Sequence, residues 1–242
     1  MTSTWDIGRL GNQIIRNLAV SLLAKKHDLK VDYWNRDLIS RLGIELFSGN
    51  STHSYMQILN DDNYFDFYNS ECLQCDFDLQ YSYFQTKEIT NMLYRYLHTD
   101  EVKSRIIAHN PFRERYEKNN DLYIHIRLTD ASRFNPGITY YINAIQNVQF
   151  DNLYISTDEP EHDIIKELLQ LHPSAQLLSY DEIMTFQFAS TCKHIILSHG
   201  SFSAVIGYLS FFSTVYYPEY EPGKVWYGDM FSIDGWIQLK TG

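Results

Sequence analysis

The sequence predicts an α/β protein with a parallel β-sheet. In the second half of the chain, short apolar runs alternate with longer stretches of helical periodicity, the pattern of strands joined by helices. The run Leu122–Ile126 is almost continuously apolar, as expected of a strand covered on both faces. With 242 residues, 44% of them hydrophobic, the chain can bury the core of one large domain or two small ones.

The first elements are predicted to form a β–turn–α–β unit between residues 3 and 34. An extended start at Trp5-Asp6-Ile7 leads into the turn Gly8-Arg9-Leu10-Gly11 and then into a helix through Lys26. The helix is indicated by apolar residues at helical spacing, namely Ile14, Leu18, Leu22 and Leu23. Residues 31–34 follow as the next strand, and residues 35–85 give no assignment.

A domain boundary is predicted near residue 112. Two helices, at 87–97 and 100–108, are followed by Pro111 and a polar run over 113–121, which is typical of a linker. The expected domains are therefore 1–112 and 113–242.

The second half is predicted to continue as alternating strands and helices. After the strand at 122–126, the expected order is helix 139–148, strand 153–156, helix 159–171, a strand near Leu177, helix 181–189, strand 194–197, helix 202–211 and strand 215–217.

Composition excludes several functional classes. A formal net charge of -10 argues against broad binding to nucleic acid or anionic membranes. No stretch has the roughly 20 apolar residues of a membrane span, and the N-terminus lacks an apolar signal region, so a cytoplasmic protein is expected. Cys72 and Cys75 form a single CxxC without a second ligand pair, which favours reduced thiols over a metal site.

Polar clusters follow three of the predicted strands, at residues 125–130, 156–159 and 198–203. Ligands of parallel sheets bind beyond the carboxyl ends of the strands, so these clusters should converge. The guanidinium of Arg127 could bind a diphosphate through two parallel hydrogen bonds. The helix that begins at Gly200-Ser201 has free backbone N–H groups at its amino end, and these favour phosphate. The hydroxyls of Ser201 and Ser203 add donors, and Asp158 could accept from a base or ribose. Together they predict a nucleotide-diphosphate site.

Each of these residues also has a purely structural interpretation. Arg127 could pair with Asp130, Ser201 is a good helix N-cap, and Asp158-Glu159-Pro160 is a common helix opening. The Gly8-x-x-Gly11 turn is too short a match to indicate NAD, but it should place Arg9 and Asn12 at a cleft between the halves. Asp76-Phe77-Asp78 is a DxD sequence of the kind that holds a divalent cation in some glycosyltransferases, which leaves a metal-dependent alternative open.

Taken together, the motifs resemble the inverting α-1,2-fucosyltransferase family. The similar segments occur in the family's order over nearly the whole chain, and the box at 125–130 is the most specific of them. It matches the family's His-x-Arg-Arg-Gly-Asp at His125, Arg127 and Asp130, whereas Leu128 and Thr129 depart from it. The other similar segments are Gly8 to Gln13, Tyr83 to Lys87, Ser156 to Asp158, Ser198 to Ser203, Trp226-Tyr227-Gly228 and Gly235-Trp236-Ile237.

The resemblance implies a GT-B-type glycosyltransferase: two Rossmann-like domains facing each other across a cleft. It implies transfer of L-fucose from GDP-fucose to a glycan hydroxyl, with inversion, without a metal and without any cofactor. By this resemblance Arg127 would hold the β-phosphate. For an inverting transfer the candidate catalytic residues are Arg127 and Asp130, with Asp130 either the base for the acceptor hydroxyl or a group that only orients Arg127. The implied substrate-binding residues are Arg9, Gly11, Asn12, His125, Asp158, Ser201, Phe202 and Ser203. Another nucleotide sugar, such as a UDP-sugar, and a non-catalytic sugar- or nucleotide-binding module remain alternatives.

Overall fold

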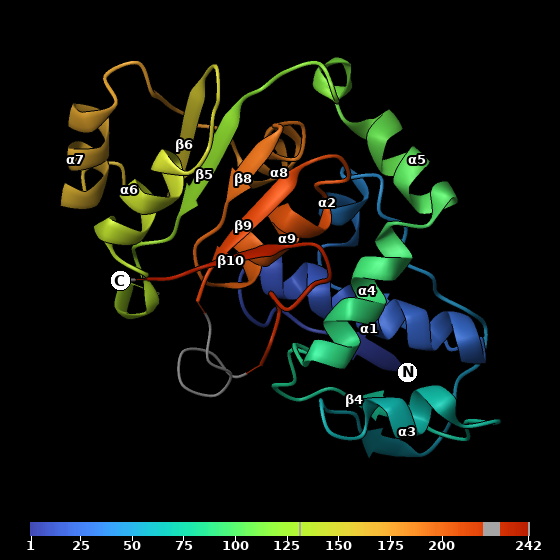
Figure 1. The fold of residues 1–242 in the computed structure, drawn as a ribbon. Helices are drawn as coiled ribbons and strands as arrows, with labels where there is room; N and C mark the ends of the chain where they lie inside the picture. The colour runs from blue at the N-terminus through green and yellow to red at the C-terminus, as the bar shows by residue number, and fades with distance from the viewer. Residues whose placement is uncertain (131, 220–227, 242) are drawn as a thin grey trace.

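The C-terminal half is built on a six-stranded parallel sheet. The computed structural model describes residues 1–130, 132–219 and 228–241, and its largest sheet has the strand order β10-β9-β8-β5-β6-β7, with every described pair parallel (Figure 1). Its strands are β5 (Leu122–Ile126), β6 (Leu153–Thr157), β7 (Gln176–Leu177), β8 (His194–Ile196), β9 (Thr214–Pro218) and β10 (Ile237–Leu239). The predicted α/β class with a parallel sheet is confirmed.

Helices cover both faces of this sheet. Successive residues of β5 point to opposite faces, and since both sets are buried, each face needs a covering layer. Leu122, Ile124 and Ile126 belong to one buried cluster, together with residues of α6 (Ile138–Gln146) and α7 (Asp163–Leu171). Tyr123 belongs to a second cluster, with residues of α8 (Glu182–Ala189) and α9 (Ser201–Tyr208). A strand buried on both faces explains the almost unbroken apolar run in the sequence.

The strand order reverses between β5 and β8. From β5 the chain moves outward through β6 to β7, and it returns across the sheet to β8 and β9 on the other side of β5. The loops that leave the carboxyl ends of β5 and β8 therefore run to opposite sides of the sheet. Open parallel sheets bind ligands at such a position.

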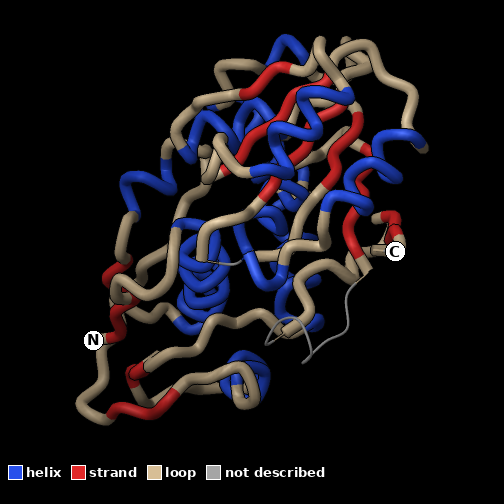
Figure 2. The backbone as a smooth tube through the Cα atoms, turned by 90° about the vertical axis from the view of Figure 1, so that its left-hand side faces the viewer, coloured by secondary structure: helices blue, strands red, loops and turns tan. Residues whose placement is uncertain are grey.

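The N-terminal half is smaller and contains two pairs of parallel strands. Its strands are β1 (Thr2–Thr4), β2 (Val31–Tyr33), β3 (Met56–Ile58) and β4 (Asp76–Asp78), and β1 pairs with β2 as β3 does with β4. Its helices are α1 (Leu10–His27), α2 (Arg36–Ser40), α3 (Tyr64–Asn69), α4 (Lys87–Leu97) and α5 (Asp100–His109). Seen from the side, the strands of this half lie below the six-stranded sheet (Figure 2).

Helix α1 connects the two halves. It is buried along most of its length, and it runs between α9 above and the α3–β4 segment below (Figure 1). Residues of α1, of α4 and of α8 and α9 all belong to one hydrophobic cluster, so the core is continuous across the expected boundary at residue 112. The division into domains 1–112 and 113–242 stays a prediction, as does their facing arrangement.

Most predicted elements are found, α4 and β5 with the predicted ends and others with shifted ends. The helix expected from residue 159 begins at Asp163, because His162 accepts the amide of Ile164 and so caps it. The first strand is Thr2–Thr4 rather than residues 5–7, since its amides and carbonyls pair with β2. Two short helices and two three-residue strands lie in the unassigned 35–85 region, and β10 was not predicted. Trp226 and Tyr227 lie outside the described residues.

A close backbone contact at Gly11 leads to a stability prediction. A β-carbon at Gly11 would lie 2.5 Å from the backbone nitrogen of Phe202, at the start of α9. Gly11→Ala should therefore push α1 away from α9 and lower the free energy of unfolding by about 1–3 kcal/mol, although alanine is the better helix former. Urea unfolding measures this change.

The control is Lys25→Ala at an exposed position of the same helix, which should stay within about 0.5 kcal/mol of the unmodified chain. Equal stability of Gly11→Ala and the unmodified chain would contradict the contact.

Candidate functional site

The end of β5 places a neutral histidine inside the protein. His125 is buried, and its Nδ1 forms a 2.6 Å hydrogen bond with Oγ of Ser203 in α9. Its ring lies 5.0 Å from the ring of Phe202, which in turn stacks on Phe186 at 4.2 Å. Burial lowers the pKa of His125 to about 3, with the Asp158 carboxylate acting in the opposite direction. His125 is therefore an uncharged, oriented group at neutral pH.

Arg127 follows two residues later and contacts two carboxylates. Its Nη1 lies 2.6 Å from Oδ2 of Asp158, and its Nη2 lies 2.5 Å from Oδ1 of Asp130. The Arg127 side chain is 16% exposed, and Asp130 is the more exposed of the partners, at 56% against 20% for Asp158. The guanidinium thus has one inner and one outer partner. The structural alternative raised for Arg127, a pair with Asp130, is realised here.

Asp158 is held as a carboxylate by the loop that follows β5. Its Oδ1 accepts the amide of Leu128 at 2.8 Å, and its Oδ2 accepts the hydroxyl of Thr129 at 2.5 Å. Burial alone would raise the pKa of Asp158, but these hydrogen bonds and the charge of Arg127 together lower it. Asp158 therefore joins the ends of β5 and β6 and fixes Arg127 between them.

A second arginine reaches this cluster from the N-terminal half. Nε of Arg9 lies 3.5 Å from Asp130, and its Nη1 lies 3.8 Å from Asp158. The positive charges of the two arginines, Arg9 and Arg127, therefore offset the negative charges of the two aspartates where the two halves of the chain meet. Arg9 and Asp130 are both more than half exposed, so solvent screens this part of the cluster and it can rearrange at little cost.

Two pockets meet at this cluster and share Arg9, Arg127 and Phe202. One, of about 220 Å³, also contains His125, Asp158 and residues of the β7–α8 segment, including Tyr180 and Thr185. The other, of about 280 Å³, also contains Asp130 and residues from the start of α1 and of α9, including Asn12 and Ser201. We refer to them as the inner pocket and the outer pocket.

The outer pocket lies at the amino ends of two helices. Gly200, with φ of 105°, precedes α9, and Ser201 is its first residue. Arg9 precedes α1, whose backbone meets that of α9 at Gly11. Free N–H groups and positive dipole ends at such helix starts favour an anion.

The structure brings the residues proposed from sequence into one place, with different roles. His125, Arg127, Asp158, Arg9 and Phe202 line the inner pocket; Asp130, Asn12, Gly11 and Ser201 line the outer one. Ser203 is fully buried and holds His125 and the amide of Ser198 instead of facing either pocket.

Sequence reasoning missed Thr129, Tyr180 and Thr185. Thr129 stands in the box at 125–130, where its hydroxyl was a visible signal. Tyr180 and Thr185 lie near the start of α8, and no local pattern marks them because they reach the inner pocket only through the fold.

The DxD sequence lies outside these pockets. Asp76 is fully buried in β4, where it accepts the amide of His53, and Asp78 accepts the amide of Gln80. Within residues 1–130, 132–219 and 228–241, no group of three or more His, Cys, Asp or Glu is arranged to hold a metal ion. None of the helices in these ranges combines the length and the apolar character of a membrane span.

Among proteins of known structure, this chain is similar to fucosyltransferases. No family model and no curated protein matches the chain. Among solved structures, the fucosyltransferase NodZ from Bradyrhizobium is similar with a TM-score of 0.41 and 13% identity, covering 67% of this chain and 61% of that one. The NodZ alpha-1,6-fucosyltransferase co-crystallized with GDP gives a TM-score of 0.36 and 14% identity, covering 60% and 53%. This chain thus spans about three fifths of the NodZ chain or less.

The burial of His125 predicts a pH dependence of stability. Its pKa is about 3 in the folded chain and 6.5 in an unfolded one, so between these values the unfolded state binds more protons. The histidine's contribution is complete above about pH 6.5 and is lost as pH falls, by at most about 1.4 kcal/mol per pH unit.

Urea unfolding between pH 4.5 and 7 should therefore show a steeper loss for the unmodified chain than for His125→Gln, which does not titrate. The lowered pKa of His125 would be contradicted if the free energy of unfolding fell equally with pH in both proteins. An NMR titration of His125 with a midpoint near pH 6.5 would also contradict it.

Proposed function

We propose that this chain is a glycosyltransferase that uses a nucleotide-diphosphate sugar. The observation that carries the proposal is the outer pocket, where Arg127 and the amino end of α9 face one space at the reversal point of a parallel sheet. A bidentate cation and free backbone N–H groups are a suitable combination for a diphosphate. The adjoining inner pocket, with the rings of Phe202 and Tyr180 and the hydroxyl of Thr185, suits a nucleoside.

Diphosphate binding in this scheme requires Arg127 to change one partner. Asp158 is held by the amide of Leu128 and by Thr129, whereas Asp130 is mostly exposed. A phosphate would therefore displace Asp130 from Nη2 of Arg127 while Asp158 continues to orient the guanidinium. Arg9 is within reach of the same charges and can follow either Asp130 or the phosphate.

The chemistry follows from these positions. As the bond between the anomeric carbon and the phosphate oxygen breaks, charge develops on the leaving diphosphate, where Arg127 and the α9 terminus stabilise it more than in the ground state. The acceptor hydroxyl forms the new bond from the opposite face of the sugar, with inversion. The released Asp130 carboxylate is the proposed base for the hydroxyl proton. No step requires a metal.

The donor we propose is GDP-fucose, with α-1,2 transfer to a glycan hydroxyl. Support comes from the order of motifs that resemble the α-1,2-fucosyltransferase family, above all His125, Arg127 and Asp130. The departure at Leu128 is accommodated structurally, because this side chain is 1% exposed and packs in the core beside α6 and α7. The similar NodZ structures include an alpha-1,6-fucosyltransferase, so analysis of the product by NMR has to distinguish α-1,2 from α-1,6 transfer.

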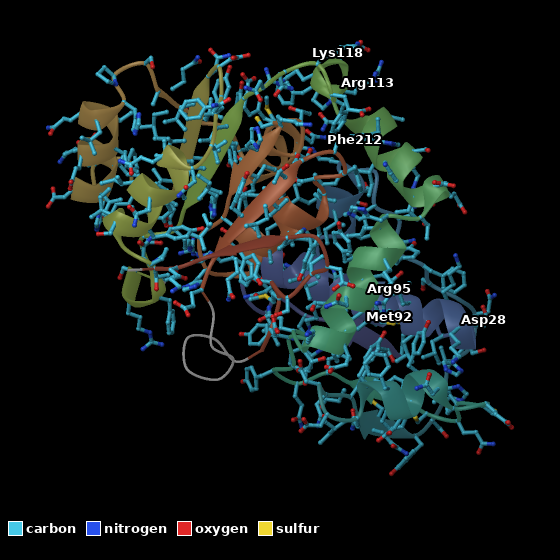
Figure 3. The ribbon with its side chains drawn as sticks, viewed as in Figure 1. Asp28, Met92, Arg95, Arg113, Lys118 and Phe212 are labelled. Carbon is cyan, nitrogen blue, oxygen red and sulfur yellow. The ribbon has the colours of Figure 1, made fainter. Side chains whose placement is uncertain are left out.

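Arg127→Ala tests the phosphate assignment. Loss of a charge-stabilising contact should lower kcat/KM for sugar transfer by about 10²–10³. The control is Arg95→Ala on α4, labelled in Figure 3, which lines neither pocket and should leave turnover unchanged. Turnover of Arg127→Ala within twofold of the unmodified chain would refute the assignment.

Thermal melts with nucleotides test the donor and the absence of a metal. GDP or GDP-fucose at 100 times its Kd should add about 2.7 kcal/mol, a rise in Tm of roughly 5–11 °C, and EDTA should not change it. A response to UDP compounds instead would keep the site but discard fucose. Loss of the response in EDTA would favour a metal-dependent enzyme. Binding without turnover would favour the non-catalytic module.

A further inference from the structure

A third pocket opens beside the outer pocket and has a different character. It measures about 530 Å³ and is lined by Asp61, Gln80, Tyr81, Ser82, Tyr83 and Gln85. Tyr83 also lines the outer pocket, so the two spaces adjoin at this ring. A molecule in the third pocket would therefore extend toward the place where Arg127 and Asp130 lie.

The loop over residues 80–85, which forms most of this pocket, is anchored by hydrogen bonds to side chains of α1. Arg16, on α1 and only 1% exposed, donates from Nη2 to the carbonyl of Gln80 at 3.0 Å. At the other end, Phe84 is fully buried, and Nε2 of Gln85 donates to Oδ1 of Asn12 at 2.8 Å. Both Gln80 and Phe84 have positive φ, 41° and 56°, so the short segment between them is sharply turned at each end. The loop is thus a fixed support rather than a loose connection.

Tyr81 lies on this support with its ring in solvent. It is 81% exposed, more than any other large hydrophobic side chain among the described residues. Leaving an aromatic ring unpacked on an anchored loop forgoes the stabilisation that burial would give. A flat exposed ring is, however, a good surface for the apolar C–H face of a sugar.

The remaining lining groups are those that bind sugar hydroxyls. Asp61, Gln80, Ser82 and Tyr83 supply carboxylate, amide and hydroxyl oxygens and N–H donors. The buried guanidinium of Arg16 provides a positive charge to offset Asp61. Burial lowers the pKa of Arg16, and electrostatic interactions with Tyr83, Asp78 and Asp61 act in the opposite direction. Its Nε and Nη1 have no hydrogen-bond partner among the described residues. A pocket with balanced charge, many polar groups and one free ring favours a neutral saccharide over an ionic ligand.

Exposed aromatic side chains continue along the same edge of the N-terminal half. Phe77 in β4 donates its amide to Thr2 in β1, and Asp76 lies beside Met1, so β1 and β4 run in the same direction. Trp5 therefore follows β1 at the edge where Tyr81 follows β4, and Trp34 follows the parallel strand β2 there.

We infer that the pocket at Asp61, Gln80–Tyr83 and Gln85 binds a neutral oligosaccharide acceptor, with the Tyr81 ring stacking on one sugar unit. The inference rests on the proposed function, because the adjoining outer pocket supplies the reason for an acceptor at this position. Tyr83, shared by both pockets, marks the passage from the acceptor to the reaction centre.

The test measures saccharide binding and nucleotide binding separately. Saturation-transfer NMR is recorded with lactose, cellobiose, maltotriose and chitotriose on the unmodified chain, Tyr81→Ala, Tyr81→Phe and Tyr55→Ala, and each protein is also melted with and without GDP. At least one saccharide should bind the unmodified chain, and Tyr81→Ala should weaken it about fivefold or more. Tyr81→Phe keeps the ring and Tyr55→Ala removes an exposed ring elsewhere, so both should bind normally.

The outcomes separate this inference from the proposed donor. An unchanged saccharide signal in Tyr81→Ala, or no signal from any of the four saccharides, would overturn the acceptor site even if GDP raises Tm. A parallel loss of the GDP response in Tyr81→Ala would also count against a separate site. A Tyr81-dependent saccharide signal without a GDP response would support the saccharide site and reject the proposed donor.

Discussion

The junction between α1 and α9 determines how the parts of the candidate site come together. Gly11 has no side chain, and this lets the backbone at the start of α1 approach that of Ser201 and Phe202. Two helix amino ends from opposite halves of the chain consequently open onto one pocket. Since α1 also carries Arg16 beneath the Tyr81 loop and Asn12 against Gln85, its position determines both pockets that face the N-terminal half.

Around this junction the charges are arranged in an inner and an outer layer. Asp158 and Arg127 form the inner layer, where hydrogen bonds from the β5 loop and partial burial hold both groups. Arg9 and Asp130 form the outer layer, exposed and more weakly held. A site of this kind keeps one cation oriented and lets a ligand anion replace a carboxylate, because the outer pair is screened by water and costs little to separate.

The interior beside the charges is apolar and aromatic. His125 is kept uncharged by burial and lies against Phe202, which stacks on Phe186. A neutral histidine does not compete with Arg127 for an anion, and its ring adds to the aromatic wall of the inner pocket. The three adjoining pockets thus differ in character. We assign the nucleoside to the aromatic inner pocket, the diphosphate to the cationic outer pocket, and the acceptor to the pocket beside Tyr81.

The sequence by itself determined the parallel sheet and the convergence of its polar strand ends. β5, β6 and β8 have short apolar cores followed by polar clusters, and strand direction alone brings those clusters to one edge, so His125, Arg127, Asp158 and Ser201 could be proposed as neighbours. α4 and β5 were predicted with their observed ends because strong periodicity and an unbroken apolar run mark them. The three-residue strands β3 and β4 are too short to show a period.

Only the tertiary structure decided which partners these groups have. Arg127 contacts Asp158, Ser203 faces inward and Gly11 serves a helix contact, and each of these depends on segments far apart in the chain. The pair of Arg127 with Asp130, three residues on, was visible in the sequence. The same holds for Tyr180, Thr185 and the Tyr81 loop over Arg16. The residue pattern within one helix or strand indicates which of its side chains are buried and where the element ends. Contacts between elements depend on how they pack together, and no single stretch of the sequence encodes that packing.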